Sequence, residues 1–463
     1  MCKVTLAWRS IVLSAALSIL SPVFAATAAS VPDDEIADHA HQALSRNRHE
    51  RHDAIDWLVK RGDSRAVAPL IHLMRWVPEQ SDVIDRGLAA ITGRPAGGNW
   101  FDWMVWQQQH PEIKPYAGFV AFAADLLALS DERFGRFVRA DLPFDIRVEE
   151  ITWGGVAVDG IPALDRPAMV AAADAAYLNP DDLVFGVEID GDDRAYPLRI
   201  MNWHEMANDV VGGVPVSLAY CTLCGAAILF DGRVDGRSPA FTFGSSGLLY
   251  RSNKLMYDRQ TDSLWDQFTG QPVSGALYRS GITLNVLPLV TTKWAAWRAR
   301  HPQTKVLSLV TGYQRDYGPG VAYREYFGSP DLMFPASLRS DDLAQKDVVF
   351  GIRAPGGVKA WPLSRFLPGR VINDRVGFLD VVVFGDAATR SVRAYDSGGR
   401  QFAAGTTDDE LREADQSGVD RRWKVTEAAL VGPSGEMLPR LPGHLAYWFA
   451  WVGNFEAATL GGN

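Results

Sequence analysis

An internal repeat constrains the fold of this chain of 463 residues more than any other feature. Residues 182–231 align with residues 347–396 without a gap, at a constant offset of 165, and about fourteen of the fifty positions are identical. The likeness resumes where LPLVTTKWAAW, from position 287, aligns with LPGHLAYWFAW, from position 441. Repeats of this length predict two similar lobes packed together. We therefore expect residues 182–310 and 347–460 to be two copies of one β-rich unit.

The hydrophobic pattern divides the chain into a helical part and a β-rich part. In residues 31–135 apolar side chains recur at i, i+3, i+4 and i+7, which predicts helices in a short solenoid-like domain. Further on, short β-branched runs such as GVPVSLAY alternate with Gly, Asp and Pro, which predicts strands and hairpins. The expected fold class is therefore α+β. It has a helical N-terminal domain, a first β-rich lobe at 145–345 and a second, degenerate lobe at 346–463.

The N-terminus has the pattern of a secretory signal peptide. Lys3 and Arg9 precede the apolar run IVLSAALSILSPVFA and the small residues AATAAS, so residues 1–28 are the expected signal. No later run is long enough to span a membrane, and the net charge of -9 argues against a nucleic-acid partner. We expect a soluble exported protein, periplasmic or secreted, that loses Cys2 on cleavage and keeps two cysteines.

Both remaining cysteines lie in AYCTLCGAA, at positions 219–227. The flanking runs VPVSLAY and AAILFD predict strands, so Cys221 and Cys224 are expected at a strand–turn–strand corner. In redox sites of the thioredoxin type, the motif opens a helix whose dipole lowers the thiol pKa, and no helix is expected here. A Cys-x-x-Cys-Gly turn between strands is instead typical of metal sites, with Gly225 supplying the left-handed residue.

The remaining ligands of such a site have to come from elsewhere in the first lobe. His204, in MNWHEMAND, is the nearest histidine, and a fourth ligand could be Glu205, Met256 or Asp258. Zinc in a closed structural site wants four ligands, usually Cys or His. Copper(I) is satisfied by two or three soft ligands, and Met256 would suit it. The expected cofactor is therefore a copper or zinc ion on the two cysteines and His204, with Met256 as an extra ligand.

The repeat supports this choice of residues, because the second copy lacks every soft ligand of the first. The residues aligned with the two cysteines are Asp386 and Thr389, and Gly369 aligns with His204. Residues that occur in one copy alone are candidates for function, and the second copy is expected to be a structural partner.

Three functions remain open at this point. The first is metal binding, delivery or metal-assisted redox chemistry. The second is thiol–disulfide oxidoreduction by the two cysteines, and the third is a non-enzymatic scaffold with structural cysteines, whose helical domain docks a protein partner. The cysteines could also be inert buried thiols, and His204 could be an ordinary core residue. The chain has no G-x-S-x-G, P-loop or G-x-G-x-x-G motif, so hydrolase and nucleotide-dependent activities have no positive support.

Three stretches resemble the domain of unknown function 3179 (DUF3179) family of exported bacterial proteins. They are ITWGGVAVDGIPALDRP, FGVEIDGDDRAYPLRIMNWHEMANDVVGGVPVSLAYCTLCGAA and GLLYRSNKLMYDRQTDSLWDQ, within residues 145–345. Family members usually have Cys-Pro-Leu-Cys where this chain has Thr222 in place of the proline. The resemblance implies export but no activity, and the helical region is expected to be an addition to the family core.

Overall fold

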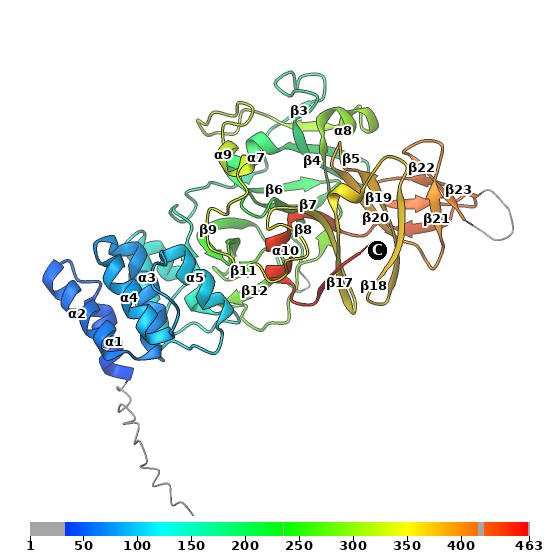
Figure 1. The fold of residues 1–463 in the computed structure, drawn as a ribbon. Coiled ribbons are helices and arrows are strands. Elements are labelled where there is room, and N and C mark those ends of the chain that lie inside the picture. Colours follow the sequence, from blue (N-terminus) through cyan, green and yellow to red (C-terminus); the bar gives the residue numbers. More distant parts are fainter. Residues whose placement is uncertain (1–32, 235, 415–420, 462–463) are drawn as a thin grey trace, which may run out of the picture.

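The computed structural model describes residues 33–234, 236–414 and 421–461 (Figure 1). The predicted signal peptide, residues 1–28, lies outside this part of the chain. Within the described residues, no helix combines the length and the apolar character needed to cross a bilayer. Helices at the N-terminal end are followed by many β-sheets, so the predicted α+β class is confirmed.

A block of α-helices forms the first part of the described chain. Its members are α1 (Asp33–Gln42), α2 (Arg48–Arg61), α3 (Val67–Trp76), α4 (Ser81–Thr92), α5 (Trp100–Gln109) and α6 (Phe119–Ala128). The helical apolar period buries one face of α2 and of α4, as with Leu58 and Leu88, whereas α3 is buried on all sides over residues 67–74. Asn47 caps the start of α2 by accepting a hydrogen bond from the His49 N–H, and Gly62 ends it in the left-handed conformation.

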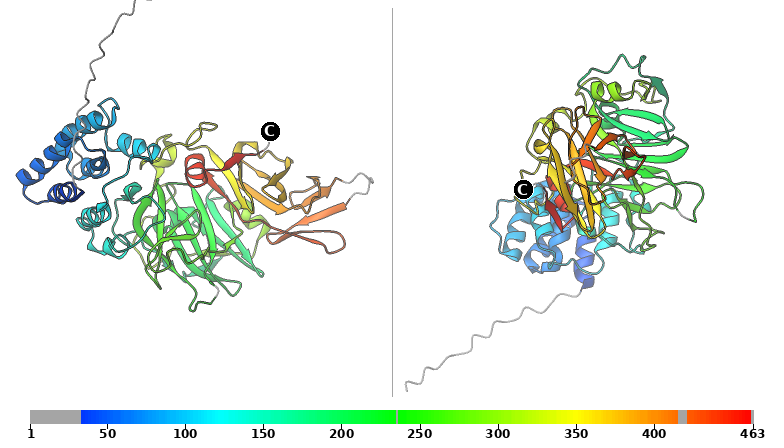
Figure 2. Two further views of the ribbon diagram at one scale, coloured as in Figure 1. Left: turned by 90° about the horizontal axis from the view of Figure 1, so that it is seen from below. Right: turned by 90° about the vertical axis from the view of Figure 1, so that its right-hand side faces the viewer.

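The helical block packs on sheet A, which is antiparallel throughout. Its strands, in order, are β1 (Ile151–Trp153), β9 (Phe243–Tyr250), β10 (Asn253–Asp258), β11 (Leu264–Asp266) and β12 (Gln271–Ser274). Buried side chains of the helices and of this sheet form one continuous core. The ring centroids of Phe137 and Tyr257, for example, lie 4.9 Å apart. Both figures of the whole chain place the helices at one end of the molecule (Figure 2).

Two further sheets complete the part of the chain before residue 310. Sheet B has the order β13 (Val286–Leu287), β8 (Ala226–Asp231), β7 (Val214–Cys221), β6 (Met206–Val211) and β2 (Leu164–Asp165). Sheet C has the order β14 (Val290–Lys293), β4 (Leu183–Ile189), β5 (Asp192–Pro197), β15 (Lys305–Leu307) and β3 (Met169–Ala171). Helix α7 (Leu198–His204) joins sheet C to sheet B, and α8 (Trp294–Arg300) follows β14.

The C-terminal part contains sheets D, E and F. Sheet D has the order β26 (Gly443–Tyr447), β16 (Val348–Ala354), β17 (Gly357–Pro362) and β27 (Ala458–Leu460). Sheet E has the order β18 (Val371–Val376), β19 (Leu379–Asp386) and β20 (Ser391–Asp396). Sheet F consists of β21 (Phe402–Ala404), β22 (Glu410–Glu413), β23 (Arg421–Val425), β24 (Ala429–Val431) and β25 (Met437–Pro439). The remaining helices are α9 (Arg324–Gly328), before sheet D, and α10 (Trp448–Asn454).

Sheets C and D have matching strand orders. In the four strands that correspond, β15 pairs in parallel with β5 and β27 pairs in parallel with β17, whereas the other pairs are antiparallel. Sheet C has one further strand, β3, which pairs antiparallel with β15. Each sheet also carries a helix on a glycine. A Cβ atom on Gly186 would lie 2.3 Å from the Trp297 ring of α8, and one on Gly351 would lie 2.2 Å from the Trp451 ring of α10. Both tryptophans therefore need a glycine beneath them.

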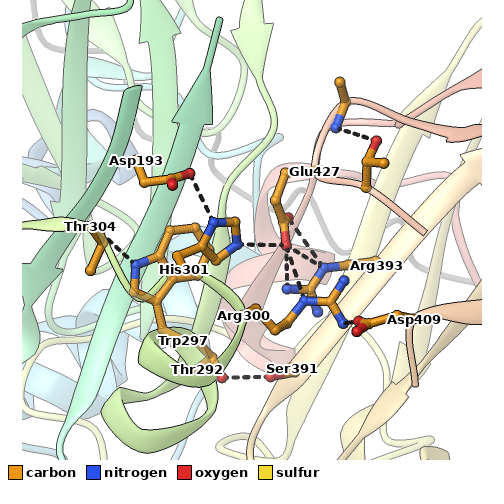
Figure 3. A network of polar contacts seen from close by, with 12 residues as sticks. Asp193, Thr292, Trp297, Arg300, His301, Thr304, Ser391, Arg393, Asp409 and Glu427 are labelled. Carbon is orange, nitrogen blue, oxygen red and sulfur yellow. Dashed lines mark hydrogen bonds and ion pairs between the residues drawn. The ribbon is translucent and has the colours of Figure 1, made fainter. Parts of the chain in front are cut away.

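A buried ionic network joins sheet C to the C-terminal sheets (Figure 3). Glu427 accepts hydrogen bonds from Arg393, at 2.6 Å, and from Arg440. On the opposite side, His301 lies 2.8 Å from Asp193 through Nδ1 and 3.5 Å from Glu427 through Nε2. Burial alone would raise the pKa of Glu427, but the two guanidinium groups outweigh it and hold that pKa well below its ordinary value.

Candidate functional site

Cys221 and Cys224 lie where β7 turns into β8. Cys221 is the last residue of β7 and pairs with Ala226, the first residue of β8. Residues 221–225, here called the dithiol turn, are closed by a 3.2 Å hydrogen bond from the Cys224 N–H to the Cys221 carbonyl. Gly225 follows with a φ of 60°. The predicted strand–turn–strand corner and its left-handed glycine are thus confirmed.

The two sulfur atoms are 2.7 Å apart, and both side chains are buried. They pack within an apolar cluster that includes Leu249, Phe268 and Trp451. Burial raises the pKa of the Cys224 thiol well above its ordinary value. Its contact with Cys221 and the nearby carboxylates act in the same direction. The Cys224 thiol therefore stays protonated at neutral pH, with the carbonyl oxygen of Ser252 and Oδ1 of Asn253 as its acceptors at 3.5 and 3.4 Å.

His204 makes both of its ring contacts away from the sulfur atoms. Its Nδ1 is 2.8 Å from the Pro162 carbonyl oxygen and its Nε2 is 2.6 Å from the Tyr317 hydroxyl. The side chain is fully buried, and burial lowers its pKa. With both nitrogens engaged, His204 holds the loop that carries Tyr317 in place.

The other candidate ligands also have partners of their own. Met256 is buried in an apolar cluster with Phe243 and Trp265, a different cluster from that of the cysteines. Asp258 accepts a hydrogen bond from the Trp265 indole, and Glu205 pairs with Lys254. No group of three or more His, Cys, Asp or Glu side chains in the described part of the chain could hold a metal ion.

A buried ion pair and a buried carboxyl group lie near the dithiol. Lys254 Nζ is 3.2 Å from Glu205 Oε2, and both side chains are at most one-tenth exposed. Burial raises the pKa of Asp266, in β11. No motif in the sequence points to Lys254 or Asp266 as members of this site. For Lys254 the sequence offers one signal, which is a lysine inside the strand NKLMYD. All the other residues of this strand are buried too.

Four residues around the dithiol turn adopt a left-handed backbone although none is glycine. They are Glu205, Arg251, Ser252 and Tyr323, with φ values of 53°, 51°, 62° and 60°. The same region holds buried polar atoms without a hydrogen-bond partner among the described residues, namely Thr222 Oγ1, Ser252 Oγ, Asn253 Nδ2 and Gln267 Oε1. Such strain and such unpaired groups cost stability and collect at functional sites.

The dithiol turn also contacts two distant segments. The Tyr326 hydroxyl, from α9, donates a 2.6 Å hydrogen bond to the Leu223 carbonyl. The Tyr447 N–H, at the end of β26, donates a 2.8 Å hydrogen bond to the Cys224 carbonyl. At the aligned turn of sheet E, the Thr389 hydroxyl lies 3.2 Å from Asp386 Oδ2. A side-chain contact between first and fourth residue thus closes both turns.

Comparison with known protein families gives a match over most of the chain. The model of a family described as "Protein of unknown function (DUF3179)" matches residues 158–459, which is more than half of the chain, and the resemblance noted in the sequence is thereby confirmed. The helical block lies outside the matched residues. Neither the curated proteins nor the solved structures contain a match.

Proposed function

The chain belongs to the DUF3179 family, whose function is unknown, and we propose that it is a thiol–disulfide redox protein. Cys221 and Cys224 form a buried dithiol–disulfide couple that exchanges electrons with a small molecule. The placement of both sulfur atoms side by side in one closed and buried turn carries this proposal. The two cysteines can therefore form a disulfide without a change of the strands on either side of the turn.

The surroundings of the dithiol favour a working site over an inert pair. A purely structural disulfide needs neither the buried Lys254–Glu205 ion pair nor the unpaired polar atoms of Thr222, Ser252 and Asn253. These features cost stability and are retained where they serve a reaction. They support a site in which protons move as the sulfur atoms change redox state.

The two β-rich lobes are, we infer, copies of one unit. Strands β4 to β8 and β16 to β20 have bounds that coincide at the offset of 165, and the Gly186–Trp297 contact has its counterpart in Gly351–Trp451. The cysteines occur in the first copy alone. The second copy therefore supports the site, and the chemistry belongs to the first.

The reaction can be written as exchange with a small disulfide. The two thiols lose two electrons and two protons as the Cys221–Cys224 bond forms. The S–S bond of the small disulfide breaks and takes up the same electrons and protons as two thiols. Burial raises the pKa of the Cys224 thiol, so the exchange begins only when one of the two thiols loses its proton.

Burial of the sulfur atoms restricts the partner. Cys221 and Cys224 are 1% and 0% exposed, so any partner reaches them only when the turn opens, and a small molecule needs a smaller opening than a folded protein does. A small molecule is therefore the proposed partner. The predicted export to an oxidising compartment agrees with a reversible disulfide, and the copper or zinc site stays a prediction.

The proposal is tested by adding the small disulfide cystamine to the reduced protein. We expect one internal disulfide to form, with release of two cysteamine molecules, as measured by mass spectrometry after thiol alkylation. The matched control is the second-lobe variant Asp386→Ser/Thr389→Ser, which should oxidise like the wild type. The Cys221→Ser/Cys224→Ser variant should release none. A different result would favour metal binding over the redox function. In that case the purified wild type holds stoichiometric copper or zinc, and the Cys221→Ser/Cys224→Ser variant holds none.

A further inference from the structure

Residues 308–347, here called the connecting segment, join β15 to β16. The structure describes all of these residues, and among them α9 is the only helix and no strand occurs. Ordered connections of this length inside a compact domain are uncommon and are usually functional. The length of the connecting segment therefore indicates a role beyond joining the two lobes.

Two hydrogen bonds hold the connecting segment against the end of α7. The Trp203 indole donates to the Asp316 carbonyl at 2.8 Å, and His204 Nε2 lies 2.6 Å from the Tyr317 hydroxyl. In the second copy the residues aligned with Trp203 and His204 are a proline and a glycine, which can form neither contact. The copy that carries the dithiol is thus also the copy that holds this segment.

A cleft of about 750 Å³ lies between α7 and the connecting segment. Trp203 lines one side of it and residues 320–326 line the other. Tyr326, within that lining, is 5% exposed and donates a 2.6 Å hydrogen bond to the Leu223 carbonyl, inside the dithiol turn. It also belongs to the apolar cluster that encloses both cysteines. Tyr326 therefore lies between the cleft and the dithiol turn.

The charge of the cleft differs from that of the whole chain. Its lining includes the exposed guanidinium groups of Arg315 and Arg324 and the carboxylate of Glu325. In the described part of the chain both arginines donate to backbone carbonyl oxygens, and no carboxylate pairs with either. The net charge of the chain is -9, so an excess of positive charge in a hollow is a local exception. It favours an anionic molecule in the cleft.

The rest of the lining is largely apolar. Trp203 and Tyr323 contribute rings, and Val321 and Met333 are 46% and 48% exposed although both are apolar. Apolar walls with a few charged groups are usual for the sites of small organic molecules. The cleft therefore suits a small molecule with a carbon chain and carboxylate groups.

We propose that this cleft receives the small disulfide that exchanges electrons with the dithiol, and that this disulfide carries carboxylate groups. The inference rests on the redox function proposed above and adds the docking place and the charge of the partner. The carboxylates of the molecule face Arg315 and Arg324, and its carbon chain packs against Trp203 and Tyr323.

The docked disulfide reaches the sulfur atoms when the dithiol turn opens on the side of Tyr326. The S–S bond of the small molecule then breaks as the Cys221–Cys224 bond forms. The protein loses two electrons and two protons, and the small molecule leaves as the two thiols that carry them.

Three small disulfides with the same two-carbon arms separate charge from size. At neutral pH 3,3′-dithiodipropionate is a dianion, 2-hydroxyethyl disulfide is neutral and cystamine is a dication. The measurement is the rate at which the reduced protein forms its internal disulfide with each one at low ionic strength, by alkylation and mass spectrometry. Because the three differ in intrinsic reactivity, each rate is compared between the wild type and Arg315→Gln/Arg324→Gln.

The wild type should react with dithiodipropionate at least about tenfold faster than Arg315→Gln/Arg324→Gln does, because the variant loses the attraction in the cleft. The rate with 2-hydroxyethyl disulfide should stay within about twofold, and the rate with cystamine should not fall. The matched control is Arg375→Gln/Arg412→Gln, in the second lobe, because both arginines are exposed and donate to backbone carbonyl oxygens. This control should react like the wild type with all three disulfides.

Salt tests the same attraction on the wild type, whether or not the double variant folds. The rate with dithiodipropionate should fall several-fold in about 1 M salt, where the screening length is about 3 Å, and the rate with 2-hydroxyethyl disulfide should not. An anionic disulfide that salt does not slow, or a folded double variant that slows all three disulfides alike or none, would overturn the docking site while the redox function stands. Exchange with none of the three would contradict the redox function and this inference together.

Discussion

The carbonyl oxygen of Cys224 accepts a 2.8 Å hydrogen bond from the backbone N–H of Tyr447, the residue that precedes α10. The contact has a counterpart, because the Thr389 carbonyl accepts a 3.1 Å hydrogen bond from the Lys293 N–H, just before α8. Each turn is thus tied to the helix start of the other half of the chain. The dithiol turn is therefore in direct contact with the start of α10.

The first prediction concerns the reactivity of the Cys224 sulfur atom. Burial raises the pKa of Cys224, so this thiol is a poor nucleophile at neutral pH. With cystamine at neutral pH, the folded Cys221→Ser variant should form a mixed disulfide at Cys224 at least tenfold more slowly than the same variant unfolded in denaturant, where the thiol is exposed. Mass spectrometry of quenched samples measures both rates. Equal rates, or faster reaction of the folded variant, would contradict a buried thiol with a raised pKa.

A second prediction tests the contact between Gly186 and Trp297. An alanine at position 186 places its Cβ atom 2.3 Å from the indole ring, so α8 or the strand must move. We expect Gly186→Ala to lower the free energy of unfolding by about 1–3 kcal/mol, as overpacking in a filled core does. Gly135→Ala is the matched control, because no atom lies within 4 Å of the added Cβ. Denaturant unfolding of both variants gives the comparison.

Glu427 gives a third prediction, for acid unfolding. Its pKa is depressed in the folded state, so its contribution to stability is complete above the ordinary value of 4.5 and is lost as the pH falls through the folded value. Glu427→Gln leaves Arg393 and Arg440 without their carboxylate and should cost about 3–5 kcal/mol at neutral pH. The difference from the wild type should shrink below pH 4.5.

The control for Glu427 is Asp409→Asn. Asp409 pairs with Arg300, but its side chain is 62% exposed, so the loss should stay below about 1 kcal/mol. A difference between Glu427→Gln and the wild type that is constant from neutral pH to acid would contradict the assigned pKa direction.

The fourth prediction concerns the pH dependence of stability that His444 causes. It is opposite in sign to the dependence caused by a histidine whose pKa is raised on folding. Burial lowers its pKa from 6.5 to about 3, and its Nε2 atom has no hydrogen-bond partner among the described residues. Between these values the unfolded chain binds a proton that the folded chain does not, so this group makes stability fall as the pH falls. His444→Phe should flatten that part of the stability curve between pH 6.5 and about 3, as measured by denaturant unfolding. An unchanged slope would exclude the buried neutral imidazole.

The elements and the dithiol turn could be predicted because their signals are local. Alternating runs with Gly-rich turns mark the hairpins, and Gly212 and Gly213 supply the positive φ values that the β6–β7 turn needs. The turn at Cys221 follows from two strands and one glycine. Sheet F was not predicted as a separate sheet, because its short strands carry little signal of their own.

The surroundings of the cysteines could not be predicted because they come from distant segments. His204 lies close to the cysteines in the sequence, but Tyr317, more than a hundred positions away, takes its Nε2 contact. Asn253 and Lys254 reach the site through the β9–β10 hairpin, and Tyr447 reaches it from the last sheet. No spacing within one strand or turn encodes such contacts.

The central claim is most directly tested by the reduction potential of the Cys221–Cys224 pair, measured by equilibrating the full protein with defined redox buffers and counting alkylated thiols by mass spectrometry. A reversible working couple predicts a single two-electron transition between about -180 and -300 mV. A potential far below about -300 mV would mark a permanent structural bridge. Two thiols that never pair under oxidising buffer would equally contradict the claim.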